Sequence, residues 1–223
     1  MKVILICGAA RSGKDTAADA IIQNQTKYNV IKIALADPIK RMAAEIYGWP
    51  VEYVWEKKDD PDPAGRVLPD GTILTGRKAL QILGTEGAKT VYKDVWSEYL
   101  SRSIYELSKP MVVNGAFLYK QYDKYRGIQK YHYAEHVKEP IFIVSDVRYF
   151  DEYKYLSERF TVCVLEIKRK KRKSTTINGV AGHSSENLDW LETVERVTIN
   201  NNGTKSDFEE SVVTTVSTFM RLT

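Results

Sequence analysis

Five short apolar runs, each bounded by polar or turn residues, recur along the chain and predict β-strands. They cover Val3–Cys7, Val30–Leu35, Ile141–Ser145, Thr161–Ile167 and Arg196–Asn200. Segments with helical spacing of apolar residues separate these runs, namely Asp15–Gln25, Asp37–Tyr47, Arg77–Gly87, Val91–Leu107, Phe150–Arg159 and Ser206–Leu222. Strands that alternate with helices favour a parallel sheet covered on both faces. We therefore predict an α/β three-layer sandwich with a mostly parallel five-stranded sheet.

Three stretches lack a regular pattern. Gly48–Gly76 is rich in turn residues, Ser108–Pro140 is crowded with tyrosine and lysine, and Lys168–Gly182 begins with six consecutive basic residues. Long irregular segments in a compact enzyme are often lids or binding loops. We expect a single domain over residues 1–223, with an inserted lobe at about 40–140 and a lid at about 168–185.

Composition sets mild limits. The net charge of +4 suits phosphate-rich small ligands and does not by itself favour nucleic acid. Cys7 and Cys163 each lie within a predicted strand and are expected to be buried thiols, as suits a reducing cytosol. No apolar run approaches the roughly 20 residues of a membrane span, and the chain enters a strand at once without a visible signal peptide. We expect a cytoplasmic protein that binds no membrane.

The most informative motif follows the first predicted strand. Gly8, Gly13 and Lys14 fit the phosphate-binding pattern G-x-x-x-x-G-K-[S/T], but Asp15 follows the lysine and Thr16 comes one residue late. Glycines let backbone N–H groups surround phosphate oxygens, and the positive end of the following helix points at them. A lysine adds a charge for the outer phosphates. The motif predicts a site for a nucleoside triphosphate.

Charged residues also follow the other strands of the expected sheet, where ligands bind in open α/β folds. Asp146 can hold Mg²⁺ through water, bind substrate or cap the next helix, and Arg148 offers a fork of donors for phosphate. The basic run Lys168–Lys173 is interpreted as part of a lid in which Arg169 and Arg172 neutralise charge on the transferring phosphoryl group. A nucleic-acid patch, a targeting signal or a solvated face are its alternatives.

One rival chemistry is visible. His132, Glu135 and His136 match H-x-x-E-H, the inverted zinc-protease pattern, which requires both histidines on one helix. The segment is short, polar and rich in tyrosine, unlike a buried metal-binding helix. We therefore expect no zinc site here.

Together the motifs resemble the deoxynucleoside monophosphate kinases of tailed bacteriophages. The likeness is carried in order by Arg11–Thr16, Ala34–Lys40, Arg77–Glu86 with Trp96, Ser145–Glu152, His183–Glu186 and Val197–Asn201. The stretch from Arg77 to Trp96 is the most specific of them. Lys89 stands near where many members have an arginine, and Met111–Lys138 looks like an addition that extends the substrate lobe or forms a dimer contact.

The resemblance implies a P-loop kinase that moves the γ-phosphoryl group of ATP to a deoxynucleoside monophosphate, with Mg²⁺, in the host cytoplasm if phage-encoded. ATP is expected on Gly8, Arg11, Ser12, Gly13, Lys14, Asp15 and Thr16, and Mg²⁺ near Asp15, Thr16 and Asp146. Lys14, Arg148, Arg169 and Arg172 are the expected catalytic cations. The acceptor is expected on Ile39, Lys40, Arg77, Lys78, Gln81, Gly84, Thr85, Trp96, Asp146, Arg148 and Glu152.

Several roles within this set have alternatives. Trp96 either stacks against the acceptor base or is an ordinary core tryptophan, and Gln81 and Glu152 either recognise base or sugar or are surface polar residues. A related kinase for another phosphorylated molecule, such as phosphomevalonate or dephospho-coenzyme A, is one alternative function. A non-catalytic module that binds nucleotide or nucleic acid is another. A homodimer is possible.

Overall fold

All five predicted strands form one sheet in the computed structural model, which describes residues 1–25, 27–114, 116–134, 139–170 and 188–222. Within this part of the chain the strand order is β2-β6-β1-β7-β8, and every neighbouring pair is parallel. The strands are β1 (Lys2–Cys7), β2 (Asn29–Ile33), β6 (Pro140–Val144), β7 (Thr161–Lys168) and β8 (Val197–Asn200). The predicted α/β class with a parallel five-stranded sheet is confirmed.

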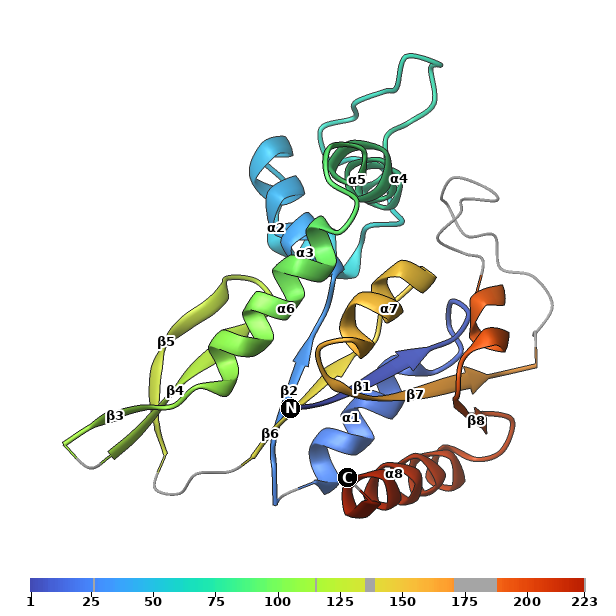
Figure 1. Ribbon diagram of the computed structural model, residues 1–223. Helices are drawn as coiled ribbons and strands as arrows, with labels where there is room; N and C mark the ends of the chain where they lie inside the picture. The colour runs from blue at the N-terminus through green and yellow to red at the C-terminus, as the bar shows by residue number, and fades with distance from the viewer. Residues whose placement is uncertain (26, 115, 135–138, 171–187, 223) are drawn as a thin grey trace.

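The central strand β1 shows why the sheet needs cover on both faces. Its side chains alternate, so that Val3 and Leu5 enter one core cluster while Ile4 and Ile6 enter another. Helices α1 (Lys14–Asn24) and α8 (Lys205–Leu222) close the second cluster, and α6 (Val95–Ser108) and α7 (Phe150–Ser157) close the first. Figure 1 shows α1 beside α8 and, apart from them, α6 and α7. Cys7 and Cys163 are buried and free.

A smaller lobe stands beyond the end of the sheet. It consists of α2 (Ala36–Tyr47), α3 (Val51–Glu56) and α4 (Gly76–Gln81) around a core that includes Trp49, Tyr53 and Leu74. Helix α3 lies in a stretch that the sequence analysis took as irregular. Its apolar residues Tyr53 and Val54 are buried in this local core, which stabilises a helix too short to be recognised from periodicity.

The next two helical predictions need correction at their boundaries. The segment predicted as one helix over Arg77–Gly87 is α4 followed by a π-helical turn, η1 (Ile82–Gly87), and a short α5 (Ala88–Val91). The helix predicted to begin at Val91 begins at Val95, because Tyr92 is extended and Asp94 accepts the first helical hydrogen bond from the Glu98 N–H. A short 3₁₀ helix, η3 (Asp189–Thr193), was not predicted.

The stretch Ser108–Pro140 contains a second sheet that the sequence analysis missed. Its strands β3 (Met111–Val113), β4 (Ala116–Asp123) and β5 (Gly127–Ala134) pair antiparallel in chain order. The turn between β4 and β5 is built by Asp123, whose carboxylate accepts the N–H groups of Tyr125 and Arg126, and by Gly127 at φ +83°. In Figure 1 this sheet projects beside α6 and the edge of the main sheet.

No helix within the described ranges combines the length and apolarity needed to cross a membrane.

Candidate functional site

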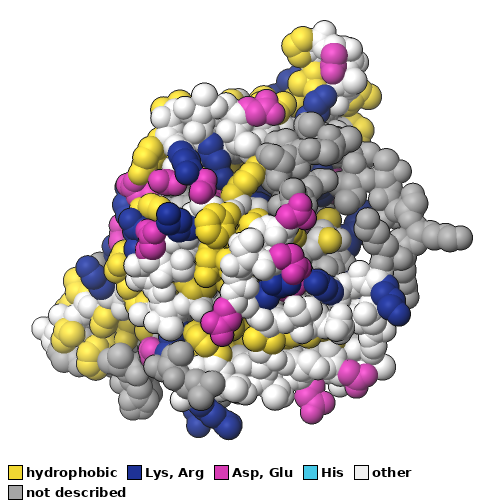
Figure 2. All heavy atoms as spheres, turned by 45° about the vertical axis from the view of Figure 1, so that its right-hand side comes forward, with side chains coloured by type: hydrophobic (Ala, Val, Ile, Leu, Met, Phe, Trp, Pro, Cys, Tyr) yellow, Lys and Arg dark blue, Asp and Glu magenta, His cyan; other side chains and the backbone are white. Residues whose placement is uncertain are grey.

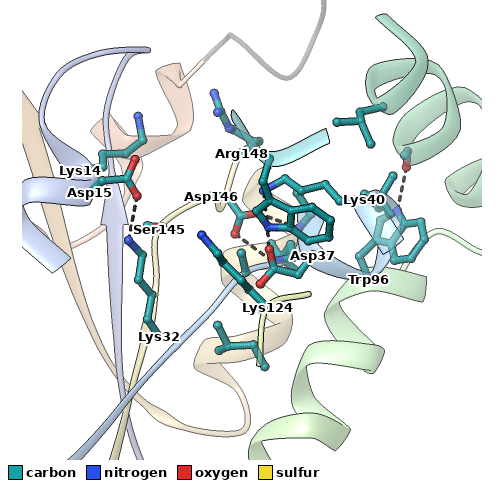
Figure 3. Close-up of a pocket in the computed structure, with 18 of the residues that line it drawn as sticks. Lys14, Asp15, Lys32, Asp37, Lys40, Trp96, Lys124, Ser145, Asp146 and Arg148 are labelled. Carbon is teal, nitrogen blue, oxygen red and sulfur yellow. Dashed lines mark hydrogen bonds and ion pairs between the residues drawn. The ribbon is translucent and has the colours of Figure 1, made fainter. Parts of the chain in front are cut away.

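A cavity of about 2320 Å³ lies at the carboxyl ends of β1, β2 and β6, where ligands bind in open α/β sheets. Its walls come from the β1–α1 loop, the start of α2, the α3–α4 lobe, the loop after β6 and the β4–β5 hairpin. Figure 3 shows charged side chains from these elements facing the same space, among them Lys14, Lys40 and Arg148.

The β1–α1 loop has the backbone shape of a phosphate cradle. Gly8 and Gly13 have φ of +146° and +111°, a region that favours glycine. A β-carbon at Gly8 would lie 2.5 Å from the Ile167 carbonyl oxygen, and one at Gly13 would lie 2.3 Å from the Asn201 amide nitrogen. The same Asn201 amide donates to the Ser12 carbonyl oxygen at 2.8 Å. The segment after β8 therefore fixes the loop from behind.

Lys14 folds back over this loop. Its Nζ donates to the carbonyl oxygens of Gly8 and Ala9, both at 2.8 Å. Burial, followed by the positive charge of Arg148, lowers the pKa of Lys14 to about 8. The Ser12 hydroxyl is buried and, among the described residues, has no hydrogen-bond partner. An anion in the loop would give Lys14 a negatively charged partner and would give the Ser12 hydroxyl a hydrogen-bond acceptor.

The residue that replaces the usual hydroxyl of the motif faces the cavity. Asp15 is exposed and lines the cavity, and its carboxylate lies 2.9 Å from Lys32 Nζ on β2. Thr16 is half-buried and is absent from the lining. Lys32 was not predicted as a site residue, because its place opposite the loop depends on how β2 lies in the sheet.

Asp146 joins the end of β6 to the start of α2. Its two carboxylate oxygens accept the N–H groups of Leu35 at 2.9 Å and Ala36 at 2.7 Å. Burial raises the pKa of Asp146 to about 6, against the lowering effect of the Ala36 hydrogen bond. Asp146 therefore positions α2 and at the same time lines the cavity.

Glu152, expected to contact base or sugar or to be a surface residue, is buried and engaged by the chain itself. Its carboxylate accepts the N–H groups of Arg148 at 2.8 Å and Tyr149 at 3.2 Å, and lies 2.6 Å from Lys89 Nζ. The same ammonium lies 3.7 Å from the centroid of the Tyr149 ring. Glu152 and Lys89 thus hold the turn that carries Arg148.

Cations also line the cavity on the side of the α2–α3–α4 lobe. Lys40 Nζ lies 3.6 Å from Asp37 and 5.3 Å from the centroid of the Trp55 ring. Arg77 directs its guanidinium at Asp59, with one N–H···O contact of 2.9 Å. Both Lys40 and Arg77 line the cavity. Their contact with an acceptor phosphate stays a prediction.

Lys58 lies in this group and was missed by the sequence analysis. It is half-buried, lines the cavity, and has no carboxylate within ion-pair distance in the part of the chain that the structure describes. Burial, then the charges of Lys40 and Arg77, lower its pKa. The run Lys57-Lys58-Asp59-Asp60 gives no signal that separates one lysine from the other; only the fold turns Lys58 inward and leaves Lys57 exposed.

Trp96 contributes to both the core and the cavity wall. Its ring joins the core cluster of β1 and α6, its indole N–H donates to the Gly84 carbonyl at 2.8 Å, and it lines the cavity. A β-carbon at Gly84 would lie 2.9 Å from Ile39, so these two residues pack in direct contact. Thr85 approaches the Tyr149 hydroxyl at 3.4 Å. The predicted residues Ile39, Gln81, Gly84 and Thr85 all line the cavity.

One predicted phosphate contact is placed differently, and another lies outside the described residues. Lys78 is absent from the cavity lining and instead lies 3.2 Å from the Thr72 hydroxyl and 3.7 Å from Asp70. Arg169 lines the cavity, whereas Arg172, the rest of the predicted lid and the segment His183–Glu186 lie outside the described residues.

The rival zinc pattern does not have the geometry it needs. His132 lies in strand β5 rather than on a helix, and Glu135 and His136 lie outside the described residues. Among the residues that are described, no group of three or more His, Cys, Asp or Glu side chains is arranged to hold a metal ion. In Figure 2 the basic and acidic side chains of the described residues are interspersed over the face shown.

Comparison with known proteins places the likeness at the N-terminus. The model of a family described as deoxynucleotide monophosphate kinase matches residues 2–58. The deoxynucleotide monophosphate kinase of Enterobacteria phage T4 is 49% identical over 51 residues, which are 23% of this chain and 19% of that protein. The match therefore spans about a fifth of the length of this curated relative.

Two solved structures align over nearly the whole chain at low similarity. A gluconokinase from Sinorhizobium meliloti 1021 has a TM-score of 0.42 at 10% identity, covering 98% of this chain and 93% of its own. A dephospho-CoA kinase from Campylobacter jejuni has a TM-score of 0.42 at 15% identity, covering 97% and 96%. The fold assignment rests on the strand order and the two core clusters, not on these scores. For residues 2–58, which contain the phosphate loop, the resemblance to the deoxynucleoside monophosphate kinase family is confirmed.

Proposed function

We propose that this protein transfers the γ-phosphoryl group of ATP to a deoxynucleoside monophosphate and releases ADP and the deoxynucleoside diphosphate. One observation carries the proposal. A glycine loop, whose Lys14 folds back onto the loop carbonyls, and a group of cations, Lys40, Lys58 and Arg77, line a single cavity. The family match over residues 2–58 supports the same reaction.

The donor side fits the triphosphate of ATP. Lys14 donates to two backbone carbonyls of its own loop, and a phosphate can replace these weak acceptors with a charged one. The unpartnered Ser12 hydroxyl and the close approach of Ile167 and Asn201 to the glycines fit a loop shaped around phosphate oxygens. In this proposal Lys14 contacts the β- and γ-phosphates.

The acceptor side fits a phosphate monoester. Lys58 is a desolvated cation beside two others and without a carboxylate partner in the described ranges, an arrangement that a bound dianion would stabilise. Arg148 lines the same cavity, and its charge lowers the pKa of Lys14. In this proposal it contacts both the γ-phosphoryl group and the acceptor phosphate. Arg148 thus stands between the donor and acceptor sides.

Phosphoryl transfer needs alignment and charge neutralisation more than covalent help. An oxygen of the acceptor phosphate attacks the γ-phosphorus, and the bond to the β–γ bridging oxygen breaks, leaving its electrons on ADP. Lys14, Arg148 and Arg169 neutralise the charge that develops on the transferred group. Core packing of Trp96 and the buried Glu152 keep the cavity wall and the Arg148 turn in place.

Mg²⁺ fits the oxygen donors at the edge of the loop. Asp15 borders the cavity, and each Asp146 oxygen retains a lone pair beyond its hydrogen bond to backbone. Asp15 and Asp146, with Thr16 nearby, would hold the ion, which would screen the negative charge of the phosphates.

A single domain with a substrate lobe at about 40–140 and a lid at about 168–185, acting in the cytoplasm, remains our prediction.

A coupled assay for ADP release tests the proposal. Each deoxy- and ribonucleoside monophosphate is offered with ATP and Mg²⁺, beside phosphomevalonate and dephospho-coenzyme A. We expect turnover with at least one deoxynucleotide and none with the other two compounds. Turnover only with the latter would replace the acceptor, and salt-sensitive DNA binding without turnover would support a nucleic-acid module instead. Light scattering of the same preparation tests for a homodimer.

A further inference from the structure

The β4–β5 hairpin lies against the substrate lobe rather than away from it. The Tyr122 hydroxyl donates to the Asp37 carboxylate at 2.8 Å, and Arg41 donates to the Lys124 carbonyl at 3.0 Å. The Arg41 guanidinium also donates to the Tyr99 hydroxyl at 2.7 Å. One side chain of α2 thus joins the hairpin turn to α6.

Aromatic and glycine contacts complete this attachment. The Tyr125 ring meets the Trp55 ring edge-on with centroids 5.1 Å apart. Gly127 is buried beside Arg41, to which a β-carbon would approach within 3.6 Å. Contacts from α2, α3 and α6 therefore hold the turn in one place, so the hairpin is a fixed part of the cavity wall.

The attached turn presents a cation to the cavity. Lys124 and Arg126 are exposed residues that line it, and Figure 3 shows Lys124 in the same space as Asp37, Lys40 and Asp146. Lys124 has no carboxylate within ion-pair distance among the described residues, because Asp123 turns its carboxylate to the backbone of the turn. Its ammonium lies over the Tyr125 ring at 4.7 Å from the centroid.

The position of the turn relative to the cation group points to what it contacts. Lys40 lies over the Trp55 ring, and Trp55 contacts Tyr125, so the turn continues the wall that begins at the proposed acceptor phosphate site. A nucleotide with its phosphate among Lys40, Lys58 and Arg77 would extend its nucleoside along this wall. Nucleobases carry carbonyl and ring-nitrogen acceptors that an ammonium group can meet.

We propose that the β4–β5 hairpin forms the outer wall of the acceptor nucleotide site and that Lys124 contacts the nucleoside part of the acceptor. This proposal rests on the proposed kinase function. It gives the β4–β5 hairpin, which lies within the stretch 111–138, a role in the active site of a single chain, in place of a dimer contact. It also makes Lys124 a determinant of which bases are accepted.

A charge series at one position tests the proposal. Steady-state KM values for the monophosphate and for ATP are measured for the wild type, Lys124→Arg, Lys124→Met and Lys124→Glu. The matched control is Lys109→Met, an exposed lysine that does not line the cavity. We expect the KM for the monophosphate to stay within about twofold for arginine and to rise by about tenfold or more for glutamate, as for one lost charge-assisted contact. The KM for ATP and the control should not change.

Binding of the monophosphate alone, measured by calorimetry, gives a readout that does not depend on turnover. Weaker binding by Lys124→Glu but not by Lys109→Met supports the proposal. Unchanged monophosphate KM and binding in Lys124→Glu, or an equal rise in both KM values, would overturn it. An absence of kinase activity in the wild type would contradict the proposed function instead, and the wild-type assay reports that outcome separately.

Discussion

The ammonium of Lys89 lies 2.6 Å from the carboxylate of Glu152, and both side chains are largely buried. Glu152 also accepts the backbone N–H of Arg148, so this ion pair links the helix after η1 to the turn that carries the arginine. Lys89, which the sequence analysis compared with an arginine of the resembling kinase family, thus has a structural partner in this chain. The turn that carries Arg148 is thus held by two residues that do not need to touch a ligand to do so.

Removing one partner of this pair should destabilise the protein. Glu152→Ala leaves the Lys89 cation buried without its partner and two N–H groups without an acceptor, so we expect a loss of about 3–5 kcal/mol in unfolding free energy. The double variant Lys89→Met/Glu152→Gln should recover part of this loss, because it leaves no unpaired charge. Urea denaturation measures both.

The exposed pair Lys93–Asp151, with a separation of 2.9 Å, provides the control. Lys93→Met should change stability by no more than about 1 kcal/mol, since exposed pairs contribute little. If Glu152→Ala cost no more than Lys93→Met, the buried pair would not be holding the Arg148 turn.

Lys14→Ala should lower the rate of phosphoryl transfer by about two to four orders of magnitude. The variant lacks the preorganised positive charge that stabilises the transferred phosphoryl group. Single-turnover kinetics with saturating ATP separate this effect from weaker ATP binding. Circular dichroism establishes that the variant is folded. Near-normal turnover in folded Lys14→Ala would remove the loop from the mechanism.

The protein should take up a proton at Lys14 when it binds ATP near pH 8. Burial and Arg148 lower the pKa of Lys14 to about 8, so at this pH a large fraction of the free protein carries a neutral amine. Triphosphate favours the charged form and raises this pKa again, whereas ATP itself is already ionised at this pH. Calorimetry in buffers of different ionisation enthalpy measures the uptake, which should fade as the pH falls well below 8.

Lys14→Arg is the control for this experiment, because arginine remains charged throughout the range. It should bind ATP without the proton uptake. A wild type whose binding enthalpy is independent of the buffer at pH 8 would show that Lys14 is already charged in the free protein.

Variants of the adjacent lysines Lys57 and Lys58 distinguish a specific contact with the acceptor phosphate from a general effect of lost charge. Lys58→Met should raise the KM for the monophosphate by about ten- to a hundredfold, the range expected for losing a hydrogen bond to a charged group. Lys57→Met, which removes the same charge from an exposed position outside the cavity, should leave it unchanged. Equal effects of the two variants would place the acceptor phosphate away from Lys58.

The main sheet could be predicted because its strands are nearly continuous apolar runs, as in β1, where both faces are buried. The second sheet could not be predicted in the same way. Strand β3 has only three residues, and β4 and β5 mix polar residues with tyrosine. The sheet is also held by contacts such as Tyr122 with Asp37, which join residues far apart in sequence. Helix α3 was missed for the same reason, since the lobe core around Trp49 stabilises it.

The candidate site shows a similar division. Gly8, Gly13 and Lys14 were recognisable because a phosphate loop is local in sequence. The inward direction of Lys58, the outward direction of Lys78 and the engagement of Glu152 depend on how separate elements meet. Sequence spacing identified the charged residues but could not decide which of them the chain uses to hold itself together.

The most direct test of the account is ADP release by the wild type with ATP, Mg²⁺ and each deoxynucleoside monophosphate in turn, with product identified by chromatography. We predict formation of a deoxynucleoside diphosphate that requires the monophosphate and is lost in Lys14→Ala. ADP release that no nucleoside monophosphate stimulates, or that is equal in wild type and Lys14→Ala, would contradict it.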